Sequence, residues 1–218
     1  MDSKGRQKTI LEATKNYVKN VLEKEGSGHD WWHIYRVRKL AMHLQKSEGG
    51  NSFIVEMAAL LHDLNDWKIW DENQDNRTKL WLEKSTATNE ESKKILEIIE
   101  EVSFKGAGVN TPAKSIEAKI VQDADRLDAI GAIGIARTFA YGGNKGRLIY
   151  DPSVMPKMHN SFEDYKRSTA PTINHFYEKL LLLKDRLNTN SARKMAESRH
   201  RFMEDFLEQF FLEWNVKI

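Results

Sequence analysis

Three observations predict an all-α fold for this chain of 218 residues. Apolar residues recur at helical spacing along most of the sequence. The sustained alternation of apolar and polar residues that half-buried strands would show is absent. Helix start and stop signals stand between the periodic stretches, where helices would need them. We therefore predict a single domain, residues 1–218, built from eight or nine helices.

The periodic stretches of the first half place its helices in order. Their apolar positions are Ile10, Tyr17, Val18 and Val21; Ile34, Val37, Leu40, Ala41 and Leu44; and Ile95, Ile98, Ile99 and Val102. The sequence Glu48-Gly49-Gly50-Asn51 predicts that one helix ends just before another begins. A capping box, Thr88-Asn89-Glu90-Glu91, predicts the start of the third stretch.

In the second half, an irregular segment separates two helical regions. Residues 142–171 hold three of the four prolines and no helical period beyond a turn, which predicts either an active-site flap or a disordered insertion. Three of its side chains could close over a substrate, although a solvated loop is favoured: Lys145, Arg147 and Tyr150. Residues 190–214 fit one long helix with apolar positions at Met195, Phe202, Phe206, Leu207, Phe210 and Phe211. We expect a core at about residues 25–135 and C-terminal helices at 172–214.

The composition limits the partners and the chemistry. A formal net charge of +2 gives no argument for a nucleic acid or a membrane surface as partner, although a small phosphorylated ligand needs only a local cluster of cations. Cysteine is absent, so any metal must be bound by His, Asp or Glu. The sequence shows neither a signal peptide nor an apolar run of membrane-spanning length, and a cytoplasmic protein is expected.

One histidine-aspartate pair stands where a helix should end. His62 and Asp63 follow the apolar stretch 55–61, and the turn predicted at Leu64-Asn65-Asp66 comes directly after them. Successive helical residues point about 100° apart, so both side chains could bind one ion only if the helix frays or turns there. On this pair alone the favoured alternative is structural, with Asp63 capping or ion-paired and His62 bonded to a backbone carbonyl.

Three aspartates lie in an alanine- and isoleucine-rich helix that should be buried. Burial of a carboxylate costs several kcal/mol unless it is paired or bound to a metal. Asp125 and Asp128 are three residues apart and share a face, whereas Asp123 lies off it. The alternative to a metal is an ion pair of Asp125 or Asp128 with Arg126, Arg137 or a lysine.

The remaining histidines and the paired tryptophans carry less information. His43, His175 and His200 lie in ordinary amphipathic helices and are expected to be packed or on the surface, and His159 in the irregular segment is uninformative. Tryptophans 31 and 32 could stack on a base, but core packing beside a helix start is favoured.

The order of these motifs resembles that of the HD superfamily of metal-dependent phosphohydrolases. Beyond the skeleton His…His-Asp…Asp, the similar blocks are GHDWWHIYRV, AALLHDLNDWK, VSFKG, DADRLDAIGAIGIAR, YDP and the C-terminal KLLLLKDRLNT with RHRFMEDFLEQF. They resemble a bacterial branch that includes manganese-dependent nucleoside-triphosphate pyrophosphohydrolases, and they cover nearly the whole chain. The resemblance implies an HD-domain helical bundle with extra C-terminal helices.

The resemblance also implies a set of metal ligands. They are His33, His62, Asp63 and Asp125, the last being the aspartate of the Ala-Asp pair found at this point in the superfamily. Asp128 would face the same pocket one turn further on, supporting the ligands or binding substrate. His29 and Asp30 would support His33, with Asp30 placed as the helix N-cap.

A nitrogen and oxygen ligand set suits a divalent ion of intermediate hardness. Four protein ligands would saturate tetrahedral zinc, whereas six-coordinate Mn²⁺, Co²⁺, Ni²⁺ or Fe²⁺ keeps two positions for water and a phosphoryl oxygen. Mn²⁺ is the expected ion, with Mg²⁺ as a further option. One metal is expected because HD enzymes with two metals draw extra histidines from the region that here separates Asp63 from Asp125, and this region has none.

The same resemblance suggests the residues that act on the substrate. Asp66 lies four residues after His62, where related nucleotidases carry a glutamate, and is the candidate general base. Lys68 would neutralise phosphate or pair with Asp66. The candidate phosphate contacts, each of which could instead form an ordinary ion pair, are Arg36, Lys105 and Arg126.

Three cations exceed the need of a monophosphate and favour a polyphosphate substrate. The leading prediction is a hydrolase that splits a nucleoside triphosphate into monophosphate and pyrophosphate. The alternatives are a 5′-nucleotidase-like phosphomonoesterase and a nucleotide-binding regulatory module without turnover. The expected partner is a small-molecule nucleotide, with no nucleic acid and no membrane, and a homodimer is left open.

Overall fold

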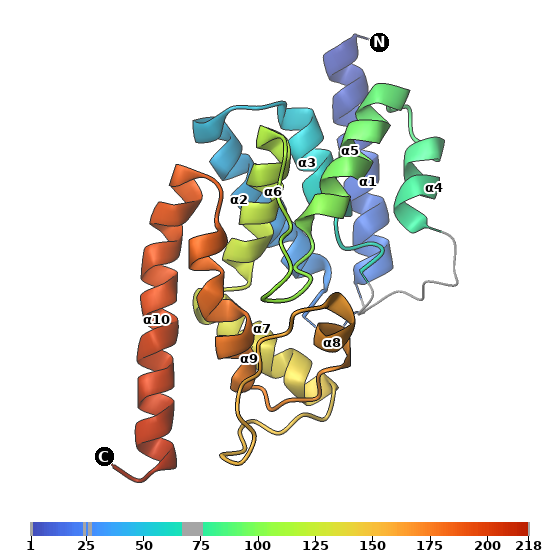
Figure 1. Ribbon diagram of the computed structural model, residues 1–218. Helices are drawn as coiled ribbons and strands as arrows, with labels where there is room; N and C mark the ends of the chain where they lie inside the picture. The colour runs from blue at the N-terminus through green and yellow to red at the C-terminus, as the bar shows by residue number, and fades with distance from the viewer. Residues whose placement is uncertain (1, 24, 26–27, 67–75, 218) are drawn as a thin grey trace. The chain divides into compact units, whose positions relative to one another are not determined.

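The structure is a computed structural model that describes residues 2–23, 25, 28–66 and 76–217 (Figure 1). Its regular elements are ten α-helices and two short 3-10 helices over this part of the chain, which confirms the all-α prediction. The two shortest α-helices have six and five residues, too few for apolar periodicity to reveal. No helix in the described ranges combines the length and the apolar character that a membrane span requires.

The chain divides into two compact units. The N-terminal unit consists of the residues up to 104 together with 111–125, and the C-terminal unit of 105–110 together with the residues from 126 onward. The single domain that the sequence predicts stays a prediction.

The N-terminal unit is arranged around one apolar helix. Its helices are α1 Ser3–Leu22, α2 Trp31–Glu48, α3 Ser52–Leu61, α4 Arg77–Lys84, α5 Asn89–Val102 and the greater part of α6 Ile116–Asp128. Eight of the ten residues of α3 are buried, and the helix packs against α1, α2 and α5 (Figure 1). A helix that is apolar on nearly every side must be surrounded in this way. The centre of the unit is therefore α3, whose C-terminal end carries the predicted His-Asp pair.

Capping side chains fix where these helices begin and end. Asn51 accepts hydrogen bonds from the backbone N–H groups of Phe53 and Ile54 at the start of α3. Gly49, the C-cap residue of α2, has a φ of +84°, a conformation that L side chains rarely adopt. Thr88 and Glu91 form the reciprocal hydrogen bonds of the predicted capping box at α5. Both helix boundaries predicted from the sequence are confirmed.

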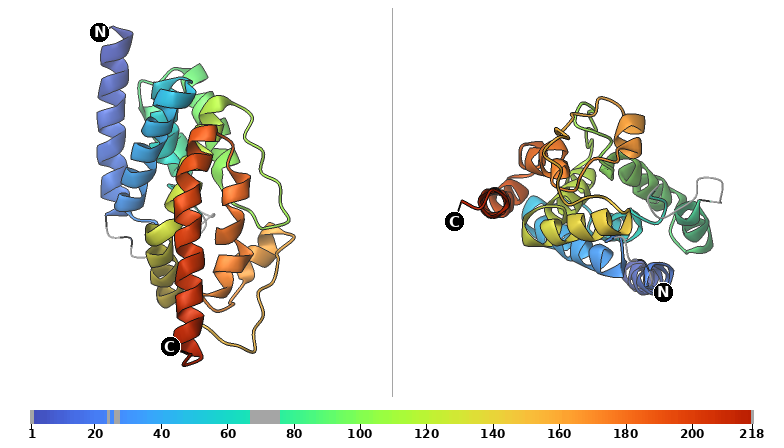
Figure 2. Two further views of the ribbon diagram at one scale, coloured as in Figure 1. Left: turned by 90° about the vertical axis from the view of Figure 1, so that its left-hand side faces the viewer. Right: turned by 90° about the horizontal axis from the view of Figure 1, so that it is seen from below.

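The C-terminal unit contains the remaining helices. They are α7 Gly131–Asn144, α8 Phe162–Arg167, α9 Asn174–Glu178, the 3-10 helices η1 Leu180–Leu182 and η2 Lys184–Arg186, and α10 Asn190–Trp214. The long terminal helix is confirmed with its predicted bounds; it packs against α7 and η2 and runs without interruption (Figure 2). Phe202, one of the apolar positions of this helix, is 51% exposed.

The irregular segment 142–171 is more ordered than its sequence suggests. Helix α7 continues to Asn144, and the six-residue helix α8 lies inside the segment, whose sequence shows no helical period beyond a turn. Backbone N–H groups of Thr172 and Ile173 donate to the carbonyls of residues 148 and 149 at 2.8 and 3.0 Å. The ring of Tyr150 lies edge-on to three rings of α10, at 4.9 Å from that of Trp214. These contacts anchor the segment within the C-terminal unit.

Candidate metal centre

The His-Asp pair lies in the turn that follows α3. The Nδ1–H group of His62 donates to the carbonyl of Ala59 at 2.9 Å, which directs Nε2 of the ring toward two carboxylates. Nε2 lies 3.5 Å from Oδ1 of Asp63 and 3.8 Å from Oδ1 of Asp125, and it has no hydrogen-bond partner among the residues that the structure describes. The hydrogen bond from His62 to a backbone carbonyl, which the structural alternative predicted, is therefore present. The other ring nitrogen, Nε2, still faces the carboxylates of Asp63 and Asp125.

The N-terminus of α2 brings two more imidazoles to the same place. Asp30 caps this helix by accepting a hydrogen bond from the backbone N–H of His33 at 2.8 Å. The Nε2 atom of His33 lies 3.1 Å from Oδ2 of Asp63 and 3.5 Å from Oδ1 of Asp125. The Nδ1 atom of His29 lies 2.9 Å from the same oxygen of Asp63. One oxygen of Asp63 is thus contacted by two imidazoles of this region.

Two overlapping groups of donor atoms result. His33, His62 and Asp125 form one, and His29, His33 and Asp63 form the other; within each, the donor atoms lie within 4.8 Å of one another. Imidazole nitrogen and carboxylate oxygen are donors that suit divalent transition metals. The buried Nε2 of His62, which no described residue hydrogen-bonds, fits a bound ion. The residues present therefore fit a divalent metal. His29 was predicted only as a support, although its position four residues before His33 was a signal that it could also be a ligand.

The charges in the cluster reinforce one another. Burial by itself lowers the pKa of His62, but the carboxylates of Asp63 and Asp125 outweigh it and raise the pKa to about 9. Burial likewise raises the pKa of each carboxyl, but the neighbouring histidines reverse this and lower both pKa values well below the ordinary range. In the metal-free protein the cluster is therefore held by a proton on His62, which a metal would displace.

The other residues predicted near this centre are taken in turn. Asp66 is half-buried in the same turn, and its N–H donates to the carbonyl of Asp63 at 3.1 Å. Arg36 is half-buried on α2, one turn beyond His33. Lys68 lies outside the described residues. The expectation that the tryptophans pack in the core is confirmed for residue 31 and wrong for residue 32, which is 59% exposed.

Three predicted substrate contacts belong to the C-terminal unit: Lys105, Arg126 and Asp128. The guanidinium of Arg126 donates to the carbonyl of Arg186, and the side chain is buried. Asp128 is 2% exposed and pairs with Arg137, whose Nη1 lies 3.0 Å from its Oδ2, so one of the ion pairs weighed from the sequence is formed. Their roles toward substrate stay predictions.

Histidines and aspartates that converge at the ends of packed helices define a class of helical proteins able to hold a divalent metal. Known proteins identify the class further. Residues 31–130 match the HD domain family. A solved HD-superfamily hydrolase from Bacillus thuringiensis is 52% identical, with 96% of this chain and 98% of that chain covered and a TM-score of 0.72.

Two other solved proteins are similar over nearly their whole length. A Lactobacillus plantarum protein is 40% identical, with a TM-score of 0.86 and coverage of 95% of this chain and 98% of that chain. Bacillus subtilis YpgQ, solved in complex with ADP, is 37% identical, with a TM-score of 0.73 and coverage of 92% and 95%. The chain therefore belongs to the HD superfamily of metal-dependent phosphohydrolases.

Proposed function

We propose that this phosphohydrolase acts on nucleotides and splits a nucleoside triphosphate into a monophosphate and pyrophosphate. The observation that carries the proposal is the buried cluster around Asp63, in which three imidazoles and a second carboxylate converge. A nucleotide as substrate is supported by the similarity to YpgQ, a protein solved with ADP.

Four side chains would hold one divalent ion, Mn²⁺ by preference: His33, His62, Asp63 and Asp125. Such an ion, when bound, lowers the pKa of a coordinated water and offsets charge on a phosphoryl oxygen. The protein fixes the donors beforehand. Ala59 orients the ring of His62 through its carbonyl, and the Nδ1 atom of His29 holds one oxygen of Asp63.

Asp66 is the residue we assign to proton transfer. The hydrogen bond from its N–H to the carbonyl of Asp63 fixes the backbone of Asp66 in the turn that carries two of the ligands. It would accept the proton of the attacking water as the water oxygen bonds to the α-phosphorus and the bond from that phosphorus to the bridging oxygen breaks, which releases pyrophosphate. Lys68 would then balance its charge or that of the phosphate.

The preference for a triphosphate rests on cations. Arg36 follows His33 by one turn on α2 and would bind a phosphate oxygen beside the ion. Lys105 is half-buried and would bind a second phosphate group. Arg126 already donates to a backbone carbonyl, and together with Asp128 it would contribute by supporting the end of α6.

The experiment compares the two products that the candidate reactions release. Metal-stripped protein is incubated with Mn²⁺ and either nucleoside triphosphates or nucleoside monophosphates, in the ribose and deoxyribose forms. Pyrophosphate and orthophosphate are measured separately. We expect one pyrophosphate for each monophosphate formed, and no product above background from the Asp63→Ala variant. Release of orthophosphate alone, from monophosphates, would instead identify a phosphomonoesterase. Absence of both products would refute the proposal.

A further inference from the structure

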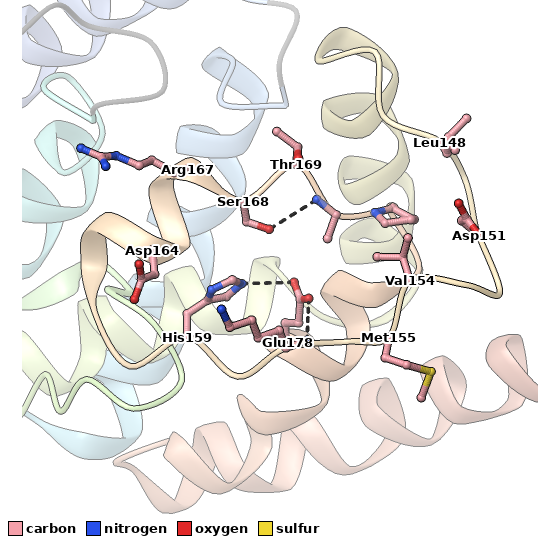
Figure 3. Close-up of a pocket in the computed structure, with 13 residues that line it drawn as sticks. Leu148, Asp151, Val154, Met155, His159, Asp164, Arg167, Ser168, Thr169 and Glu178 are labelled. Atoms are coloured by element: carbon pink, nitrogen blue, oxygen red, sulfur yellow. Dashed lines mark hydrogen bonds and ion pairs between the residues drawn. The ribbon is translucent and has the colours of Figure 1, made fainter.

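Buried polar side chains tie distant parts of the C-terminal unit together. One pair stands beside a cavity of about 500 Å³ that is lined by the segment 148–171 and by Glu178 at the end of α9. Figure 3 shows the imidazole of His159 and the carboxylate of Glu178 pointing toward one another, with Nε2 and Oε2 3.7 Å apart. Both side chains are buried, and the other oxygen of Glu178 accepts a hydrogen bond from the backbone N–H of Lys157 at 3.0 Å. The pair therefore joins the irregular segment to α9.

A second group of such side chains lies at the C-terminal end of α6, directly after a residue of the metal centre. The last four residues of this helix are Asp125, Arg126, Leu127 and Asp128. The carbonyl groups at the end of a helix have no N–H partner within the helix, and the last turn frays unless other groups bind them. Asp125 stands in this turn, so its carboxylate is held only as firmly as the turn itself.

Arg199 of α10 supplies a partner for this turn. Its Nη1 donates to the carbonyl of Leu127 at 2.5 Å, whereas the backbone N–H of Ile130 reaches the same carbonyl at 3.4 Å. The shorter bond comes from a cation, and cations stabilise the C-terminus of a helix because the negative ends of the peptide dipoles point toward it. Arg199 therefore caps α6 from a position 72 residues further along the chain.

Two further contacts within the C-terminal unit hold the same turn. The guanidinium of Arg126 donates to the carbonyl of Arg186. The Nη1 atom of Arg137 lies 3.0 Å from Oδ2 of the buried Asp128. Each residue of α6 after Asp125 is thus bound to another element: Arg126 to η2, Leu127 to α10 and Asp128 to α7.

The backbone leaves room for the stem of Arg199 beside this turn. Gly131, the first residue of α7, has a φ of +75°, which L side chains rarely adopt. A Cβ atom at this position would lie 3.0 Å from both Cβ and Cγ of Arg199, closer than packed carbons normally approach. The glycine therefore allows the guanidinium to reach Leu127.

We propose that Arg199 is a positioning residue for the metal centre, because it caps α6 and so fixes the turn that carries Asp125. The inference rests on the proposed function, in which Asp125 is one of the four ligands. Helix α6 runs through Asp125 to Asp128 without a break, so fraying of its last turn reaches Asp125 directly. Sites that bind well hold their groups within about 0.5 Å of the productive geometry, and a frayed turn cannot do so. Arg199 lies outside the residues 31–130 that match the HD domain family, so the C-terminal helix contributes to the precision of the centre.

Metal affinity tests this positioning separately from hydrolysis. Arg199→Met and Arg199→Gln both remove the guanidinium, the first with an apolar stem and the second with a polar one. Free Mn²⁺ is titrated against the full chain by electron paramagnetic resonance, and we expect either variant to bind at least about tenfold more weakly. Arg199→Lys keeps the charge and should recover most of the affinity. Without metal, the amide hydrogens of residues 125–128 should exchange with solvent faster in the Met and Gln variants than in the parent chain.

Two other variants of α10 separate positioning from folding. Leu207→Ala empties a buried position about two turns further along the helix, so it should lower the stability toward urea. Its affinity for Mn²⁺ should stay within about twofold of the parent value, because the site lies apart from the end of α6. Arg201→Met removes an exposed guanidinium of the same helix and should change neither quantity.

The outcomes decide between the inference and the function on which it rests. An Arg199→Met or Arg199→Gln variant that is folded and binds Mn²⁺ as the parent does would overturn the inference, as would equal weakening by Leu207→Ala. Asp125→Ala shows which claim has failed. If it loses Mn²⁺ while the variants of Arg199 keep it, the inference alone falls; if it binds as the parent does, Asp125 is no ligand and both fall.

Discussion

The two units of this protein both bury histidine beside carboxylate, but in different numbers and from different elements. In the N-terminal unit, three imidazoles surround Asp63, and the Nε2 atoms of His33 and His62 both approach Asp125. In the C-terminal unit, one imidazole faces one carboxylate across 3.7 Å, beside a cavity of about 500 Å³. Several donors around one point suit an ion, whereas one imidazole facing one carboxylate gives an ion too few donors. Both places use histidine and a carboxylate, so the number of side chains that converge distinguishes the cluster around Asp63 from the pair of His159 and Glu178.

Removal of the shared carboxylate should separate the two sites most strongly. The Asp63→Ala variant loses the group that three histidines contact, so we expect hydrolysis of a nucleoside triphosphate to fall by roughly 10³-fold or more. The matched variant Asp205→Ala, at an exposed position of α10, should keep full activity. Substantial activity in Asp63→Ala would remove this cluster from the reaction.

Truncation of one core residue in each unit should show whether the units are stabilised separately. Leu60→Ala on α3 and Phe176→Ala on α9 each empty a fully buried position, and each should lower the free energy of unfolding by about 2–5 kcal/mol. Urea titrations with and without Mn²⁺ measure the effect, and the metal should raise the stability of the N-terminal unit. Phe202→Ala, at a position that is 51% exposed, serves as the control and should change stability by less than about 0.5 kcal/mol. A larger loss in the control than in the core variants would contradict the packing described for α10.

His29 provides a graded test of the metal centre. Its ring holds one oxygen of Asp63 at 2.9 Å, and loss of such a support commonly costs about 10- to 100-fold in metal affinity. We expect His29→Ala to weaken Mn²⁺ binding by this factor, measured by titration of free Mn²⁺ in electron paramagnetic resonance. His43→Ala, at an exposed position of α2, is the matched control. An effect as large as that of Asp63→Ala would instead make His29 a ligand.

The change expected for each pH unit is the smallest of these effects, and it concerns the dependence of metal binding on pH. The pKa of His62 is raised to about 9, so a metal must displace its proton below that pH, and affinity for Mn²⁺ should rise about tenfold for each pH unit up to there. The stability of the metal-free protein should change with pH in the opposite direction. The stability contributed by protonated His62 is fully present below its unfolded pKa of about 6.5 and is lost as the pH rises through about 9. Calorimetric titrations at several pH values measure the first trend, and urea titrations without metal the second; an affinity independent of pH would contradict the cluster's protonation.

The sequence could reveal the metal centre because its parts lie at helix ends. His62 and Asp63 follow the most apolar helix of the chain, and the apolar period itself marks where that helix stops. Assignment of Asp125 as the partner acid required the resemblance to the HD superfamily, since spacing alone left Asp125 and Asp128 equivalent. The structure distinguishes them, because Asp128 pairs with Arg137 whereas Asp125 faces His33 and His62.

The cavity of the C-terminal unit could not be predicted in this way. His159 lies in a segment without period, and Glu178 ends a helix of five residues, too short to leave a periodic signal. The two meet because backbone bonds tie the segment to α9 and to the residues around Gly108. Such contacts between distant, irregular parts of a chain follow no local rule, and the structure is needed to find them.

The hydrogen bond from His62 to the carbonyl of Ala59 also gives the protein a built-in spectroscopic label. The Nδ1 proton is buried and shared at 2.9 Å with a carbonyl of the helix that the ring follows. Its exchange with solvent requires that the end of α3 open, so its resonance should persist far downfield in a proton NMR spectrum recorded in water. That single line would report the integrity of the centre through the length of a titration, without substrate and without any introduced probe.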